Sequence, residues 1–225
     1  MTIQKNFFIE KIHSIRRPRP DDFQIKEAAE KIKNSKNPII ISGGGVFYSN
    51  AMEELSNFAI KHNIPVTQTV MGYSTMKRDH SHYAGQIGGL GGKNTNDLAK
   101  ETDLAIAVGT KLADFTTGSW ANFENENFKL LSINVSRFDA NKHLAQAVVG
   151  DAKVSLIELS EALGDWKVGD EWNEKSQREL KVWNEHIDKE SAPTNQEVPS
   201  YIQVIGAIYR NSEPTDIAVT PQAVW

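Results

Sequence analysis

Short, almost wholly apolar segments alternate with stretches of helical periodicity from Asp21 to about Leu163, and this alternation constrains the fold more than any other feature. Two of the segments, 38–41 (PIII) and 104–108 (LAIAV), contain no charged residue. Strands of this kind are covered on both faces, as in a parallel sheet. Strands that alternate with helices also imply right-handed crossover connections. The sequence therefore predicts a three-layer α/β fold, a Rossmann-like parallel sheet with helices on both faces.

The same pattern predicts where the individual elements lie. Strands are expected at 38–41, 66–70, 104–108, 130–135 and 147–149, and the glycine-rich stretch 71–92 is expected to be a long loop. Side chains that accept hydrogen bonds from free amides at helix starts predict N-caps at Asp21 or Asp22, at Ser49 or Asn50, and at Asp151. Shorter helices are expected near 96–100 and 139–145. Apolar spacing predicts these inward-facing side chains: Ile25, Ala28, Ala29, Ile32, Met52, Leu55, Phe58, Ala59, Val154, Ile157, Leu159 and Leu163.

The chain divides into four parts by composition. Residues 1–20 end in RRPRP and are expected to be a linker, whose arginines are solvated. Residues 21–164 form the α/β domain. Residues 165–199 are charged and carry tryptophans, which predicts a helical linker. Residues 200–225, with a helix near 201–209 and a strand at 217–219, are expected to open a further domain that is truncated here.

Composition excludes several classes of function. The chain has no cysteine, which rules out a disulfide scaffold, a cysteine nucleophile and thiolate zinc sites. Its net charge of −4 favours neither nucleic acid nor an anionic membrane as a partner. No apolar run approaches the ~20 residues of a membrane-spanning helix, and the polar start lacks a signal-peptide pattern. We therefore expect a cytoplasmic protein.

Glycines follow the first strand directly, at 43–45, where a backbone without Cβ atoms allows a phosphate to approach. The dinucleotide-binding fingerprint is incomplete, because Tyr48 stands where its third glycine belongs. A nucleotide-facing loop and a tight turn for close helix packing are thus equally supported. Gly109, Lys111 and Asp114 follow the strand 104–108 and offer a turn and two charges, which either meet a ligand or simply pair in solvent.

Three other motifs lack the pattern that their chemistry needs. GGLGGK at 88–93 has neither P-loop glycine spacing nor a hydroxyl residue after the lysine, since Asn94 stands there. Asp79, His80 and His82 offer no further metal donor, so surface or packing histidines are favoured. Ser119 does not sit in a nucleophile elbow. We therefore predict neither catalytic nor metal-binding residues.

The ordered motifs IISGGGVFYS, NIPVTQTVMG, GGLGG, DLAIAVGTKLADFTTGS, FDANKH, VVGDAK and PSYIQVIGAI resemble the middle region of thiamine diphosphate-dependent enzymes. Within that family they are most similar to the branch that opens the ring of trihydroxycyclohexane-1,2-dione in myo-inositol degradation. The resemblance covers nearly the whole chain. It implies a central domain between an N-terminal pyrimidine-binding domain and a C-terminal diphosphate-binding domain.

That placement implies which cofactors belong to the full-length enzyme. The family's activating glutamate and its magnesium motif Gly-Asp-Gly lie in the other domains, and no GD pair of this chain is followed by glycine. Thiamine diphosphate and Mg²⁺ are therefore expected in the whole hydrolase, a homo-oligomer, and not on this chain alone, which is expected to be inactive. In relatives that bind a ligand in the central domain, the resemblance places the contacts at Gly43, Gly44, Gly45, Met71, Gly72, Gly109, Thr110, Lys111, Asn134, Gly150 and Asp151.

Two alternatives stay open. The first is a free-standing domain that binds FAD or an adenine nucleotide, although Asn134 and Ser136 replace the acidic residues expected at a nucleotide-binding strand end, which makes this ligand not favoured. The second is the central domain of an enzyme similar to acetolactate synthase. The motifs SGGGVFYS and VGTKLADFTTGS favour the ring-opening branch over this one.

Overall fold

The structure is a computed structural model that describes residues 9–10, 12–194, 196–213 and 215–217. Its centre is a six-stranded sheet in the order β3-β2-β1-β4-β5-β6, in which every neighbouring pair is parallel. This strand order is that of the Rossmann fold, and its direction reverses between β1 and β4. The strands are β1 (Pro38–Ser42), β2 (Val66–Gln68), β3 (Tyr83–Gln86), β4 (Leu104–Val108), β5 (Lys129–Asn134) and β6 (Gln146–Val149).

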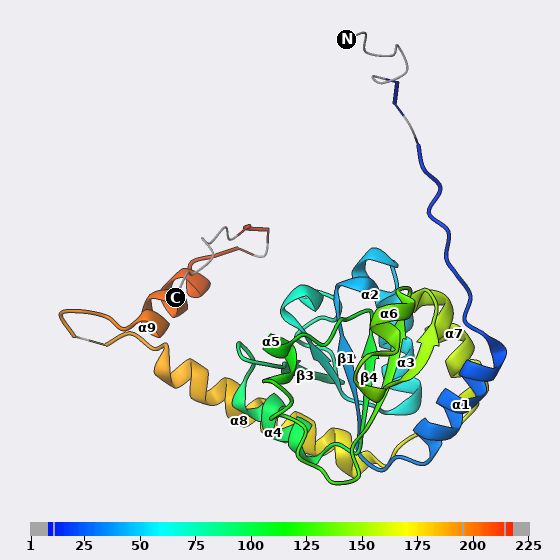
Figure 1. The fold of residues 1–225 in the computed structure, drawn as a ribbon. Helices are drawn as coiled ribbons and strands as arrows, with labels where there is room; N and C mark the ends of the chain where they lie inside the picture. The colour runs from blue at the N-terminus through cyan, green and yellow to red at the C-terminus, as the bar shows by residue number, and fades with distance from the viewer. Residues whose placement is uncertain (1–8, 11, 195, 214, 218–225) are drawn as a thin grey trace.

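Helices cover the sheet on both faces, which confirms the three-layer prediction (Figure 1). One layer contains α1 (Asp22–Lys33), α3 (Met52–His62) and α7 (Ala152–Leu163), in which α7 contacts both α1 and α3. The other contains α4 (Lys93–Glu101) and the first half of α8 (Asp170–Glu190). Short helical turns occupy the loops after the strands: α2 (Gly44–Tyr48), η2 (Val70–Gly72), α5 (Asp114–Thr117), α6 (Arg137–Ala140) and η3 (Lys142–Leu144).

The central strands are buried because their sequences are apolar on both faces. All five residues of β1 and all five of β4 are buried. The predicted inward stripe of α1, which Asp21 caps through its side chain, is also buried throughout. In α7 the prediction is partly wrong, since Ile157 is exposed and Leu156 packs inward in its place. Leu159 and Leu163 are buried as predicted, Val154 is half-buried, and Ala152, Ser155 and Leu156 complete the buried stripe.

Three local predictions are wrong around the glycine-rich loops. Residues 71–92 are not one loop, because β3 lies within them as the edge strand of the sheet. Ser49 and Asn50 do not cap α3, whose N-cap is Ala51. Ser49 instead ends α2, and its hydroxyl accepts a hydrogen bond from the Lys153 amide (3.0 Å). The strand after Pro65 also ends at Gln68 rather than at Val70.

The long helix α8 covers the edge strand β3 and joins it to the rest of the sheet. Trp172 is buried, and its indole N–H donates to the Pro38 carbonyl (2.7 Å). The Gln177 amide donates to the Tyr83 carbonyl (2.9 Å), so a helix side chain supplies a partner to the open side of the edge strand. Covering an edge in this way prevents strand pairing with other chains.

The second half of α8 leaves the sheet and carries α9 (Tyr201–Arg210), as Figure 1 shows. Ser200 and Gln203 form a capping box at the start of α9. The predicted strand at 217–219 lies outside the described residues except for Ile217. No helix in the described part of the chain is long and apolar enough to cross a membrane.

Candidate functional site

The eleven residues proposed for ligand contact lie at one edge of the sheet. Parallel strands end at the same edge, and these residues lie at or just after the ends of β1, β2, β4, β5 and β6. In a Rossmann-like sheet a ligand binds in the crevice where the strand order reverses. Here that point lies between β1 and β4, and therefore between the Gly43 and Gly109 loops.

Backbone atoms fill the space between those two loops. The Gly43 amide donates to the Val108 carbonyl and the Gly45 amide donates to the Gly109 carbonyl, both at 2.9 Å. A Cβ on Gly43 would lie 2.5 Å from the Gly109 oxygen, and one on Gly45 would lie 2.6 Å from the Gly109 Cα. Glycine is therefore needed at both positions for the two loops to pack this closely. Two of the three amides of the triplet already donate hydrogen bonds within the protein. This geometry favours the tight-turn interpretation of the triplet.

In the neighbouring loops, too, amide groups donate to acceptors within the protein and a glycine allows close packing. Gly109 has a left-handed φ of 61°, and its amide donates to the Ile133 carbonyl (2.9 Å). The side-chain amide of the buried Asn134 donates to the Thr110 carbonyl (3.1 Å), which joins the end of β5 to the loop after β4. A Cβ on Gly72 would lie 2.1 Å from the Ser42 oxygen, so this glycine is needed for close approach to β1.

Lys111 and Asp114 lie exposed at this edge on the loop after β4. Neither forms an ion pair with any residue that the structure describes, so the predicted pairing of the two in solvent is not seen. Asp114 instead begins α5.

Gly150 and Asp151 hold the N-terminal connector against the sheet edge. The Asp151 amide donates to the Pro18 carbonyl (2.8 Å), and its carboxylate caps α7 and pairs with Arg17 (3.1 Å). Arg19 pairs with Glu158 on α7. Arg17 and Arg19 are therefore anchored to the domain and not freely solvated as predicted. Asp151 is fully used as a cap and an ion-pair partner.

The histidines of the DHSH segment directly precede β3. They therefore lie at the amino ends of the strands, opposite the glycine loops. His80 bonds Ser56 (2.8 Å between Nε2 and Oγ), and His82 bonds Asn63 (3.1 Å between Nε2 and Oδ1). Burial lowers the pKa of His82 to about 4, and burial also lowers the pKa of His80. Both rings are thus neutral near pH 7 and serve packing. No group of three or more His, Asp or Glu side chains in the described residues could hold a metal ion.

Comparison with known proteins identifies the family. The model of the thiamine pyrophosphate enzyme central domain matches residues 25–159. The chain belongs to this family. A 3D-(3,5/4)-trihydroxycyclohexane-1,2-dione hydrolase of Clostridium perfringens strain 13 is 39% identical over 183 residues, which cover 81% of this chain and 29% of the relative. The Bacillus cereus AH820 protein of the same name is 43% identical over 157 residues, or 70% of this chain and 24% of the relative.

A solved structure supports the fold of this central domain. It is a putative thiamin diphosphate-dependent enzyme from Mycobacterium smegmatis, with a TM-score of 0.56 and 22% sequence identity over 69% of this chain and 30% of that one. The chain spans less than a third of the length of the curated relatives that it matches. The matched stretch therefore corresponds to part of those relatives and not to their whole length.

The family implies thiamine diphosphate, but the described residues of this central domain do not fit it. Diphosphate binding through a metal needs a set of oxygen ligands, and the described residues contain no such cluster. Asp151, Asp165 and Asp170 follow glycines, but Asp151 is committed to Arg17 and the α7 cap, while Asp165 and Asp170 are exposed at the ends of α7 and α8. No catalytic step is therefore assigned to these residues.

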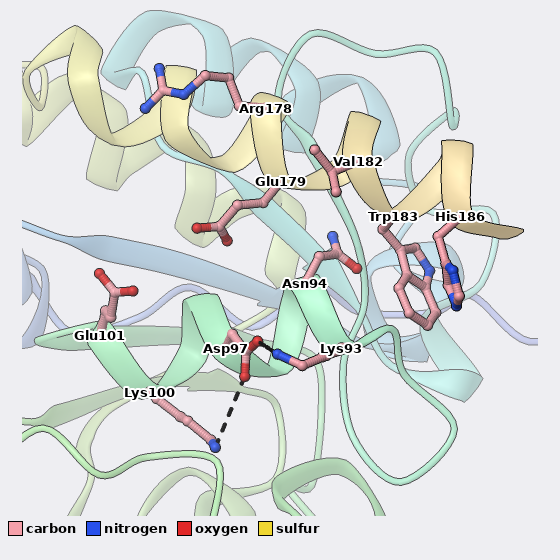
Figure 2. A pocket seen from close by; sticks show the side chains of 10 residues that line it. All are labelled: Lys93, Asn94, Asp97, Lys100, Glu101, Arg178, Glu179, Val182, Trp183 and His186. Carbon is pink, nitrogen blue, oxygen red and sulfur yellow. Dashed lines mark hydrogen bonds and ion pairs between the residues drawn. The ribbon is translucent and has the colours of Figure 1, made fainter.

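A groove of about 930 Å³ that the sequence did not predict lies between α4 and α8. Figure 2 shows side chains of both helices around it, including Asn94, Asp97, Glu179, Trp183 and His186. Burial raises the pKa of Glu179, which also pairs with Lys175 (3.6 Å). Only the tryptophan spacing in α8 signalled that this helix packs on another element.

His62 was also missed as a structural residue. Its ring is fully buried, with Nδ1 2.7 Å from the Trp166 carbonyl oxygen and Nε2 3.0 Å from the Ser160 hydroxyl. The neutral tautomer that donates from Nδ1 satisfies both contacts. His62 thereby fastens the segment between α7 and α8 to α3. The sequence predicted only that a helix ends at this residue.

Proposed function

We propose that this chain is the central, non-catalytic domain of a thiamine diphosphate-dependent hydrolase that opens the ring of trihydroxycyclohexane-1,2-dione in myo-inositol degradation. The observation that carries the proposal is 39–43% identity to hydrolases of that name over 183 and 157 residues. The engaged amides at the sheet edge support a structural role for this domain. Thiamine diphosphate and Mg²⁺ would then be bound by the other parts of the enzyme.

The proposal includes the organisation of the whole protein. Residues 1–20 would link a pyrimidine-binding domain to the α/β domain at 21–164. Residues 165–199 would lead to a diphosphate-binding domain, of which 200–225 are the start. The apolar helix α9 supports this, since a helix that is apolar nearly all round is usually buried. We further propose a cytoplasmic homo-oligomer.

A chimera tests the function. Residues 21–190 replace the matching region of the Clostridium perfringens hydrolase, and hydrolysis of the cyclic dione is measured with thiamine diphosphate and Mg²⁺. We expect the chimera to retain ring-opening activity, whereas the same hydrolase with its central region deleted, the control, should have none. The isolated chain with both cofactors should give no turnover. Turnover by the isolated chain, or an inactive but folded chimera, would contradict the proposal.

The alternative of a free-standing FAD- or nucleotide-binding domain is tested by absorbance. Flavin bands, or an excess at 260 nm released on denaturation, would favour it. A thermal-shift screen with FAD, ADP and NAD should give no rise in Tm if the domain is ligand-free, since specific binding stabilises the folded state. The engagement of the Gly43, Gly45 and Gly109 amides within the protein supports the ligand-free outcome.

A further inference from the structure

A polar corner of the α/β domain holds a side chain from the N-terminal connector. The corner lies where α2 ends at Ser49 and α7 begins at Asp151, and both residues are buried. Nη1 of Arg17 lies 3.0 Å from the Ser49 hydroxyl oxygen, and 3.3 and 3.1 Å from the two carboxylate oxygens of Asp151. The same nitrogen also donates to the Ser49 carbonyl. A single guanidinium nitrogen therefore meets a buried anion and two neutral acceptors.

Contacts within the domain hold the walls of this corner in place. The Lys153 amide donates to the Ser49 hydroxyl oxygen (3.0 Å) and to Oδ1 of Asp151 (3.1 Å). The Lys153 ammonium group pairs with Glu54 on α3 (2.7 Å), which joins the start of α7 to that helix. A cation that binds in the corner finds its acceptors already positioned, and this lowers the cost of ordering them.

The connector is suited to deliver such a cation. Each of its two prolines follows an arginine, and a residue before proline favours an extended backbone. Proline also fixes φ, so less backbone freedom is lost when the segment docks. The Pro18 carbonyl accepts from the Asp151 amide (2.8 Å). Pro20 is buried against Gly150, where an added Cβ would lie 2.9 Å from the Pro20 Cδ. Figure 1 shows this segment running beside α7.

We propose that the corner of Ser49 and Asp151 is a guanidinium-binding site, that its ligand is the chain's own Arg17, and that this contact is a latch which holds residues 17–20 on the domain. Arg19 pairs with Glu158 on α7, but its side chain is 69% exposed, and exposed ion pairs contribute little. The latch therefore depends on Arg17. It does not depend on the reaction of the whole enzyme, so the two proposals can fail separately.

Thermal unfolding of the full chain gives the first test. Arg17→Ala leaves the buried Asp151 carboxylate without its cation and should lower Tm by at least about 3 °C. The matched control is Arg16→Ala, the neighbouring arginine, which is exposed and takes part in no ion pair that the structure describes for the connector. It should change Tm by less than about 1 °C.

Chemical rescue separates a guanidinium site from a general loss of packing. Methylguanidinium at about 20 mM should restore at least half of the Tm lost in Arg17→Ala, because a ligand that binds only the folded state stabilises it. The parent chain, whose site is filled, should show no rise and corrects for the weak denaturing action of the cation. Tetramethylammonium, a cation without N–H donors, should not rescue. Rescue should also be absent in Arg17→Ala/Asp151→Asn, in which asparagine still caps α7 but carries no charge.

Limited proteolysis tests the latch without altering the connector. Within RRPRP, trypsin can cut only between residues 16 and 17, because it does not cleave arginine–proline bonds. Asp151→Asn should speed this cleavage by at least about fivefold, since cleavage follows the population of the opened segment. Each of the following would overturn the proposal: an Arg17→Ala variant as stable as the parent, failure of methylguanidinium to rescue it, equal rescue of the double variant, or a cleavage rate that Asp151→Asn leaves unchanged.

Discussion

Strand β4 in the sheet body and helix α9 in the C-terminal arm are both apolar in sequence but differ in burial. We define the body as α1 to α7 and the arm as the second half of α8 with α9. Ile106 in the body is 0% exposed, whereas Ile208 in the arm is 58% exposed. Both lie in segments of high apolar content, so periodicity alone does not show whether an apolar face has a partner. The difference locates the stability of this chain in the body and leaves the arm available for contacts.

Truncation of a core side chain should give the largest effect. Ile106→Ala removes buried methyl groups from the centre of β4 and should lower the free energy of unfolding by about 2–5 kcal/mol. The same change in the arm, Ile208→Ala, should stay within about 0.5 kcal/mol. Urea unfolding followed by circular dichroism measures both. Equal losses in the two variants would show that α9 is buried in solution and would remove the contrast between body and arm.

Sequence reasoning could identify the body because its signals are local. The strand Leu104–Val108 is apolar on both faces, and Asp21 supplies its own capping side chain to α1, so both elements were found. The strand β3 was missed because it is only four residues long, contains Gly85 at a φ of 108° and is paired on one side alone. The helix α2 was missed because it begins with two glycines, which are poor helix formers.

At the candidate site, too, the sequence identifies the residues but not their long-range partners. All its glycines were recognised, since a glycine after a buried strand stands out in the sequence. What the sequence could not show is where their amides donate, because the acceptors at Val108, Gly109 and Ile133 lie on strands and loops far along the chain. Only the assembled sheet distinguishes a loop that waits for a phosphate from one that is bonded to its neighbour.

Two glycine substitutions, one within the body and one just before α8, should change stability by an intermediate amount. Gly109→Ala places a Cβ 2.6 Å from the Gly45 backbone at a left-handed φ of 61° and should cost about 2–4 kcal/mol. Gly169, which precedes α8, has an ordinary φ of −59° and no atom within 4 Å of an added Cβ. Gly169→Ala should therefore be neutral within about 0.5 kcal/mol. Differential scanning calorimetry measures both, and a stable Gly109→Ala variant would contradict the close contact of the two loops.

The smallest expected effect is a change in stability with pH, which tests the packing role of the histidines that precede β3. Below pH 6.5 the unfolded chain binds a proton at His82, which the folded protein binds only near its pKa of about 4. Stability should therefore be fully present above pH 6.5 and should fall as the pH drops from 6.5 toward 4. His82→Gln cannot take up this proton, so its loss of stability over that window should be smaller. Urea midpoints at pH 8, 6 and 5 measure the change, with pH 8 as the reference at which His82 is neutral in both states. Identical pH profiles for the variant and the parent would show that His82 is open to solvent, and the packing role assigned to this segment would then be wrong.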